Sequence, residues 1–292
     1  MDLNILVVGL TAGSLYALVA VGFNILYRPT NVLNFAQGDL VMLGAMVGAS
    51  TLGFYMLPWP AALVVAVTVV SLIAVVEERV AVAPVLRRSS QSFAWIISTL
   101  AFSLIIANLA DRIWGPDPIA VQPPWPLSIR TTRIGPIRVN SYQVALVLLT
   151  VAIVFGLHRF YRTRAGKAML AMAEDRDAAL LRGINPDRIS RLSFFLGGAV
   201  AALTGLLAAP LFFSSTTIGT SMLITGFATA AVGGVGNNKG ALLAGYIIGI
   251  VEAAAAALLS PAYQKTVVFG LLLVILLVKP QGLFGTEDAR RV

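Results

Sequence analysis

Long apolar runs alternate with short polar segments along the whole chain. Uncharged stretches cover residues 3–27, 40–76, 89–110, 139–158, 192–238, 240–251, 253–264 and 266–278. One crossing of a bilayer takes about 20 apolar residues, so most of these runs are long enough to be membrane helices. Pro58-Trp59-Pro60 divides the 40–76 run, and the polar turn Ser214-Ser215-Thr216-Thr217 divides the 192–238 run, because both patterns interrupt helices.

This pattern predicts an all-α polytopic membrane protein with about eight or nine transmembrane or half-membrane helices. The predicted segments are 4–27, 38–57, 60–83, 92–111, 140–158, 191–213, 221–236, 239–259 and 264–279. The segment 221–236 is short and rich in Gly and Thr, so we expect it to be re-entrant or broken. The first segment is longer than the apolar region of a signal peptide, which predicts a retained span. We expect one transmembrane domain over residues 1–292.

Composition supports this class and excludes others. Of the 292 residues, 58% are hydrophobic and 12% are charged, about half the charge of a soluble domain. That balance excludes a soluble enzyme and a disordered chain. The absence of cysteine excludes disulfide, thiolate and iron–sulfur chemistry, and the one histidine, His158, cannot make a His-rich metal site. We therefore expect no metal site and no catalytic residue.

The basic residues predict the orientation. Putting the loop 159–191 in the cytoplasm places 16 of the 21 Lys and Arg residues inside and 5 outside, as the positive-inside rule requires. The N-terminus is then outside and the C-terminus cytoplasmic, with a periplasmic loop at 112–139. The formal net charge of +8 is explained by this bias, so no nucleic-acid partner is expected. The periplasmic loop is either a rigid surface structure or a docking surface for an external partner.

Several polar side chains fall within or beside the apolar runs. Asn34, Gln37 and Asp39 follow the first span, Thr225 lies in the short segment, and Glu252 lies in an Ala-rich helix. An intramembrane carboxylate is costly and is often functional. These five residues are candidates for lining a translocation pathway. The alternatives are an ordinary cytoplasmic turn for the first three and a paired structural carboxylate for Glu252.

Two glycine patterns need an interpretation. Gly38…Gly44-x-x-x-Gly48 is similar to Gly240…Gly245-x-x-x-Gly249, which predicts a weak internal repeat of the kind found in transporters. The stretch Gly233-Gly234-Val235-Gly236-Asn237-Asn238-Lys239-Gly240 lacks the Gly-Lys-[Ser/Thr] of a phosphate loop. It predicts close packing or an unwound segment rather than a nucleotide site. Small-x-x-x-small patterns such as Gly9-x-x-x-Gly13 predict helix packing.

The cytoplasmic loop contains a predicted helix over residues 165–181. Thr163 is a candidate cap, and Gly183 and Asn185-Pro186 are stop signals. Met169, Met172 and Leu180 would form an apolar stripe facing the cytosol. The membrane surface is one place for such a stripe, but Glu174, Asp175 and Asp177 would meet anionic lipid poorly. A protein partner is the better interpretation.

Motifs along nearly the whole chain resemble one family. They are Gly13-Ser-Leu-Tyr-Ala-Leu, Asn34-Phe-Ala-Gln-Gly-Asp, Ala173-Glu-Asp, Leu181-Arg-Gly-Ile-Asn-Pro-Asp-Arg, Ala231-Val-Gly-Gly-Val-Gly, Ile250-Val-Glu-Ala and Lys279-Pro-Gln-Gly-Leu-Phe-Gly. Together they resemble the branched-chain amino acid ABC transporter permeases, of the type that is the first of two paired subunits. Arg182 and Pro186 depart from the residues that the family leads one to expect.

The resemblance implies a multi-subunit importer in the bacterial cytoplasmic membrane. It implies a second permease in a heterodimer, two cytoplasmic ATPases that hold ATP and Mg, and a periplasmic substrate-binding protein, with no cofactor on this chain. Residues 163–185 would couple to the ATPase. The coupling candidates are Arg164, Gly166, Met169, Met172, Glu174, Asp175, Leu180, Gly183 and Asn185. Urea or short amides are alternative substrates, and an ion-coupled secondary transporter using Asp39 and Glu252 is the alternative class.

Overall fold

The structure is a computed structural model that describes residues 3–88 and 93–285. Its helices are α1 (Leu3–Thr30), α2 (Gln37–Ala49), α3 (Trp59–Glu77), α4 (Ala83–Arg88), α5 (Ala94–Trp114), α6 (Ser141–Phe160), α7 (Arg164–Glu174), α8 (Arg176–Leu181), α9 (Pro186–Phe212), α10 (Ile218–Gly233), α11 (Asn238–Leu258) and α12 (Gln264–Val278). The smaller elements are two π-helical turns (Ser50–Phe54 and Glu78–Val82), a 3-10 turn (Pro261–Tyr263) and a hairpin of β1 (Thr132–Ile134) and β2 (Ile137–Val139). Arg290 and Arg291, which the charge count placed inside, lie outside the described residues.

Seven helices of the described chain are long and apolar enough to cross a membrane. They are α1, α3 with its continuation into α4, α5, α6, α9, α11 and α12. The shorter α2 and α10 complete the nine predicted segments, and most bounds agree to within three residues. There are three exceptions: α9 already begins at Pro186 instead of 191, α4 extends the third segment from 83 to Arg88, and α2 ends at Ala49, with a π-helical turn that continues it to Phe54. The all-α polytopic class is therefore confirmed.

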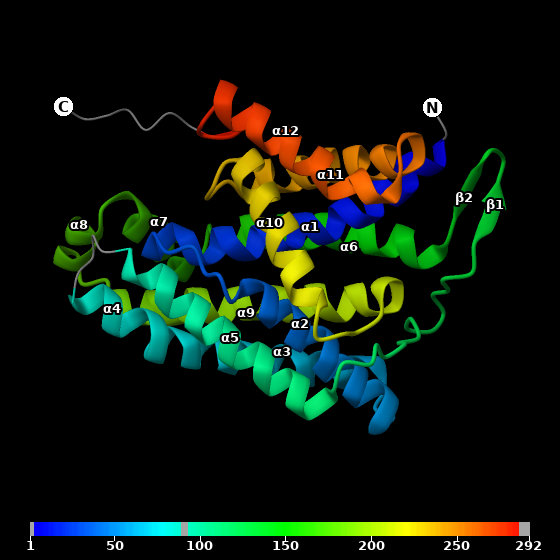
Figure 1. The fold of residues 1–292 in the computed structure, drawn as a ribbon. Coiled ribbons are helices and arrows are strands. Elements are labelled where there is room, and N and C mark those ends of the chain that lie inside the picture. The colour runs from blue at the N-terminus through cyan, green and yellow to red at the C-terminus, as the bar shows by residue number, and fades with distance from the viewer. Residues whose placement is uncertain (1–2, 89–92, 286–292) are drawn as a thin grey trace.

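Both short helices begin inside the bundle rather than at its ends (Figure 1). Non-helical chain at residues 31–36 and 213–217 leads into them. Their first turns touch, because a Cβ on Gly38 would lie 2.6 Å from the Cβ of Leu223 and one on Gly219 would lie 2.9 Å from the carbonyl oxygen of Gly38. Two half-membrane helices thus meet by their N-termini near the centre of the protein.

The helices around this point form an inverted repeat. In Figure 1, α1 runs from the end marked N toward α7 and α8, whereas α9 runs back from α8 in the opposite direction. Each is followed by a break and a half helix. The contacts are reciprocal: α1 packs on α11 as α9 packs on α3, and α2 packs on α9 as α10 packs on α1. Such repeats are a common architecture of membrane transporters.

The repeat pairs different elements from those predicted. The glycine pattern matched α2 with α11, and this correspondence is wrong because α2 is equivalent to α10. The glycines of α11 contact α1: a Cβ on Gly245 would lie 2.7 Å from the Cβ of Ala17. The glycines of α2 contact α9: a Cβ on Gly44 would lie 2.6 Å from the Cα of Ala202. The two patterns are alike because both serve close helix packing.

Close packing of α1 on α11 is confirmed for the Gly9-x-x-x-Gly13 pattern. A Cβ on Gly9 would lie 2.6 Å from the Cα of Ile250, and one on Gly13 would lie 2.9 Å from the Cα of Tyr246. Helices in lipid gain little from burying apolar surface, so close van der Waals approach is what holds them together.

The loop between α5 and α6 folds over one end of the bundle. Ile119 exchanges two backbone hydrogen bonds with Ser214, of 2.8 and 2.9 Å, next to the break before α10. The backbone N–H of Arg138 in β2 donates to Asn4 Oδ1 at 2.7 Å, which ties the hairpin to the start of α1. The indole of Trp59 donates to the Gln122 carbonyl at 3.2 Å. These contacts make the loop a packed surface structure.

Replacing Gly245 with valine should destabilise the protein, because the new side chain would meet Gly13 and Ala17 of α1. Overpacking of this kind costs about 1–3 kcal/mol. We expect the melting temperature of the purified chain in detergent to fall by several degrees. Gly270→Val is the matched control, since a Cβ on this glycine meets nothing within 4 Å. Equal melting temperatures for the two variants would contradict close packing of α1 on α11.

Candidate functional sites: an exposed helical segment and buried polar groups

The segment between α6 and α9 forms two helices and not the single predicted one. Thr163 caps α7 by accepting from Gly166 N at 3.2 Å, as predicted. Asp175 then takes an extended conformation (φ −154°) and caps α8 by accepting from Ala178 N at 2.9 Å. The prediction of one helix over 165–181 is wrong because this aspartate starts a new helix in the middle of the range. Gly183 ends α8 with a φ of +80°, which favours glycine.

Helix α7 packs back onto the bundle, so the predicted apolar stripe does not face outward as a whole. Met169 is fully buried and Met172 is 5% exposed, in contact with the main core. Gly166 allows this approach, since a Cβ there would lie 2.5 Å from the Cα of Tyr161. The expectation that both methionines face the cytosol is therefore wrong. Leu180, in contrast, is 48% exposed.

The exposed part of this segment is centred on α8. The candidates with exposed side chains or backbone are Arg164, Glu174, Asp175, Leu180, Gly183 and Asn185. Sequence reasoning missed Leu181, which is 90% exposed. The sequence signal for Leu181 was its position two residues before Gly183, at the end of a helix. Because α8 has only six residues, it is too short to bury both of its faces. Leu180 and Leu181 thus make an exposed apolar surface whose neighbours carry charges of both signs, with Glu174 and Asp175 on one side and Arg176 and Arg182 beside them.

The polar residues before and at the start of α2 are buried around its first turn. Asn34 donates to Glu77 Oε2 of α3 at 3.0 Å, and its Oδ1 accepts from Ala36 N at 2.8 Å. Gln37 is fully buried, and its amide lies against Gly22 of α1. Glu77 was missed because Glu77-Glu78-Arg79 looks like the polar end of a span, whereas the structure buries Glu77 completely.

Asp39 lies in the first turn of the same half helix. Its carboxylate accepts a hydrogen bond from the hydroxyl of Ser103 on α5. A Cβ on Gly219 would lie 3.2 Å from its Oδ1, so the carboxylate sits where the N-termini of α2 and α10 meet. The positive ends of both helix dipoles lie there, and this partial positive charge stabilises a carboxylate.

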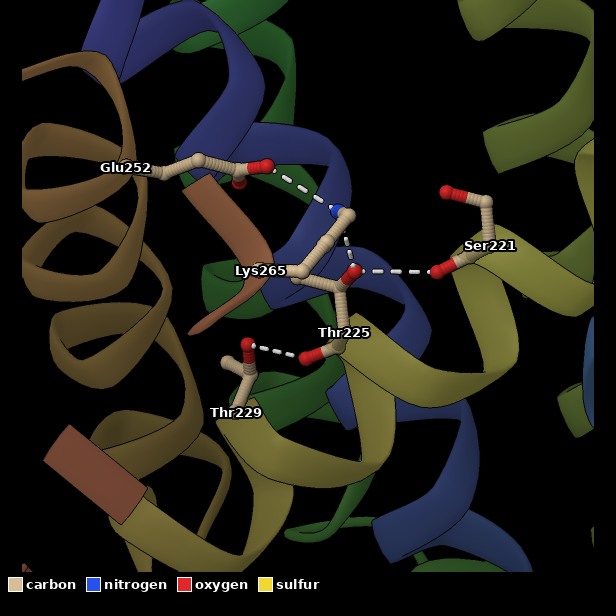
Figure 2. Close-up of polar contacts among 5 residues, drawn as sticks. All are labelled: Ser221, Thr225, Thr229, Glu252 and Lys265. Carbon is tan, nitrogen blue, oxygen red and sulfur yellow. Dashed lines mark hydrogen bonds and ion pairs between the residues drawn. The ribbon is translucent and has the colours of Figure 1, made fainter. Parts of the chain in front are cut away.

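Thr225 and Glu252 meet through a third residue, Lys265 (Figure 2). Lys265 Nζ donates to Glu252 Oε1 and to Thr225 Oγ1, each at 3.0 Å. It also lies 5.6 Å from the centre of the Tyr16 ring. The Thr225 hydroxyl donates to the Ser221 carbonyl at 2.9 Å. One cation thereby joins α10, α11 and α12, and Glu252 is a paired carboxylate.

The five pathway candidates therefore fall into two groups. Asn34, Gln37 and Asp39 surround the start of α2, and Thr225 and Glu252 share Lys265. All five are at most 6% exposed within this chain. Their role in a pathway stays a prediction, and it requires the bundle to open or a neighbouring subunit to approach them.

The glycine-rich turn between α10 and α11 is a packing site, as predicted. Asn24 Oδ1 accepts from Gly236 N at 2.7 Å, and the Arg28 guanidinium donates to the Gly236 carbonyl. The C-terminal segment covers the other side: Leu283 N donates to Val232 O and Asn237 Nδ2 donates to Phe284 O, both at 2.7 Å. The glycines allow two backbones to lie against one another here.

These features define the class of the protein. Two broken helices that meet by their N-termini within an inverted repeat are typical of membrane transport proteins. Within residues 3–88 and 93–285, no group of three His, Asp or Glu side chains is placed to hold a metal ion. The buried polar groups instead connect helices.

Comparison with known proteins identifies the family. Residues 5–277 match the model of the branched-chain amino acid transport system permease component, and the chain belongs to this family. It is 32% identical to the high-affinity branched-chain amino acid transport system permease protein LivH of Escherichia coli K12, over 97% of this chain and 96% of LivH. The protein of the same name from Salmonella typhimurium is 31% identical over the same shares. BraD of Pseudomonas aeruginosa is 31% identical over 98% of this chain and 97% of BraD.

No solved structure matches the chain. Because the chain belongs to this family and has seven helices long and apolar enough to span a membrane, the protein is a multi-pass permease of the bacterial cytoplasmic membrane.

The ion pair of Glu252 and Lys265 gives a stability prediction. Lys265→Met leaves the Glu252 carboxylate, 8% exposed, without its counter-charge. Removing one partner of a fully buried pair costs about 3–5 kcal/mol. The side chain of Lys265 is 43% exposed, so solvent screens the pair and the expected loss is about 1–3 kcal/mol. The free energy of unfolding in mixed micelles measures it. The double variant with Glu252→Gln should be more stable than Lys265→Met alone. If the double variant loses the sum of both single effects, the two side chains do not interact.

Proposed function

We propose that this chain is one of two permease subunits of an ABC importer for branched-chain amino acids. The second permease completes a heterodimer, two cytoplasmic ATPases bind ATP and Mg, and a periplasmic binding protein delivers the solute. This chain carries no cofactor of its own. The full-length similarity to permeases named for branched-chain amino acid transport supports the substrate, and the exposed α7–α8 surface supports the ATPase partner.

The α7–α8 surface carries the proposal because it joins an exposed docking face to the centre of the bundle. Leu180 and Leu181 are exposed for contact, whereas Met169 and Met172 on the preceding helix lie in the main core. Helix α7 contacts both α1 and α9, the first helices of the two repeats. A movement of the ATPase would therefore reach both halves of the permease through a single rigid element.

The buried polar groups would act in the response to that movement. Because α2 and α10 meet by their first turns, a shift of α1 relative to α9 changes the position of both half helices. In the proposed orientation, the pair of Asn34 and Glu77 lies in the cytoplasmic half, and Glu252 with Lys265 lies in the periplasmic half. We propose that the first pair holds the cytoplasmic side closed and the second pair holds the periplasmic side closed. The two sides would open in turn as the solute passes between this chain and its paired permease.

A substitution at Gly183 tests coupling. Gly183→Val forces a β-branched residue to a φ of +80°, which distorts the end of α8. In proteoliposomes of the complete transporter, we expect uptake per ATP hydrolysed to fall at least about tenfold, as for an interface change of about 1.4 kcal/mol. Gly135→Val is the matched control, since Gly135 also has a positive φ (61°) and open space around it but lies in the external hairpin.

Glu174→Lys provides a second test without backbone strain, because it reverses an exposed charge on the same surface. It should also lower uptake per ATP. If both Gly183→Val and Glu174→Lys transport as well as Gly135→Val, the surface does not couple to the ATPase.

The orientation is tested by labelling. The chain has no cysteine, so single cysteines can be placed at Ala173 and Arg130, which are both exposed. A maleimide that cannot cross the cytoplasmic membrane should label Arg130→Cys in intact cells and Ala173→Cys only after the membrane is opened. Labelling in the reverse order would show that α7 and α8 are outside.

A further inference from the structure

A second feature at the α7 end of the bundle has no part in the function proposed above. It is a cavity of about 430 Å³ between the end of α1, the end of α6, α7 and the start of α11. Its lining residues are Arg28, Val154, His158, Tyr161, Arg162, Leu170, Asn237, Asn238 and Lys239. Three permanent cations and one histidine thus face a single space, and among the described residues no Asp or Glu lines it.

The cations of this pocket are available to a ligand in different degrees. Arg28 is held in place, because its guanidinium donates to the Gly236 carbonyl and lies 5.0 Å from the centre of the Tyr161 ring. His158, Arg162 and Lys239 are exposed. Within the described part of the chain, the side chains of these three have no hydrogen-bond or ion-pair partner. One fixed cation and three free basic groups favour an anion.

Tyr161 closes the same wall, with its hydroxyl oxygen buried behind the surface. The residue is 7% exposed, and burial raises the pKa of its phenol, so the hydroxyl stays protonated and adds no negative charge to the pocket. The backbone of Asn238 begins α11 here, and the helix N-terminus adds partial positive charge. Together these groups resemble the polar end of a site built for a phosphate oxygen.

The surface next to the pocket is apolar. On α11, Leu243 (47% exposed) and Ile247 (36%) follow Lys239 at intervals of four residues, which places them on the same helix face. On α6, Phe155 (64% exposed) and Val151 (43%) precede His158 at intervals of three and four. Helices α6 and α11 are neighbours. Two apolar stripes therefore run from the basic pocket into the level of the membrane.

We propose that this pocket binds the phosphate of an anionic phospholipid, whose acyl chains lie along the stripes of α6 and α11. A free phosphate would use the cations but gain nothing from the stripes, which is why the geometry favours a lipid. Basic pockets between membrane helices are known to hold such headgroups. The proposal does not depend on which side of the membrane α7 faces, because it needs only the boundary between basic pocket and apolar surface.

Native mass spectrometry of the full chain, with the subunits that purify with it, tests the proposal. Phosphatidylglycerol and phosphatidylcholine of equal chain length are added in equal amounts. The wild type should retain phosphatidylglycerol, and Arg162→Gln with Lys239→Gln should retain it about 25-fold less, because each cation near an anionic lipid contributes about fivefold, or about 1 kcal/mol. Arg130→Gln with Arg133→Gln in the external loop is the matched control and should bind as the wild type does.

Two further experiments identify the ligand and locate its binding site. Inorganic phosphate or glycerol phosphate at millimolar concentration should not displace the lipid. Phosphatidylglycerol with a photoreactive acyl chain should label peptides from 147–158 and 239–247 of the unmodified chain, which needs no variant to fold. Displacement by the soluble phosphates would overturn the lipid assignment in favour of a free-anion site. Equal retention by the double variant, or labelling confined to other helices, would overturn the site itself.

Discussion

In the apolar interior of a membrane, every backbone N–H and C=O must find its partner within the protein, and this requirement shapes the rest of the structure. Two segments of non-helical chain lie within the bundle, and each is supplied with partners by polar side chains. Thr30 Oγ1 accepts from Val32 N at 3.2 Å and Asn34 Oδ1 from Ala36 N at 2.8 Å. In the other break, Ser214 pairs with Ile119 and its hydroxyl donates to the Ala45 carbonyl at 3.1 Å.

The same requirement accounts for the glycines and for the loop over the bundle. Broken helices are tolerated only where other helices enclose them, and α1 and α9 enclose them by approaching their neighbours without intervening side chains. In the loop between α5 and α6, Ile119 pairs its backbone N–H and C=O with those of Ser214 in the second break. The loop therefore contributes to the stability of the membrane domain. Polar residues beside the apolar runs therefore have a structural task whether or not a solute also meets them.

The sequence predicted the segments well and the contacts poorly, for physical reasons. Uncharged runs report burial in lipid directly, so all nine segments and the Thr163 cap were found. The break at Asp175 was missed because composition over 165–181 is helical throughout, and a single capping side chain decides where one helix ends. Lys265 was counted as an external charge, since nothing in a linear pattern shows that it reaches back 13 residues to Glu252. The repeat of α2 and α10 leaves little trace because packing glycines recur on most of the helices.

The meeting of the two half helices has a consequence for how the chain is made. Gly38 is synthesised roughly 180 residues before Gly219, against which it packs. At about 5–20 residues per second, the ribosome needs about 9–36 s to produce the second half helix after the first. During that interval the Asp39 carboxylate, the Gln37 amide and the non-helical segment before α2 have been made, but α9 and α10, which help to bury them in the complete fold, have not. The first half helix therefore reaches its final packing only after the second half of the repeat has been made.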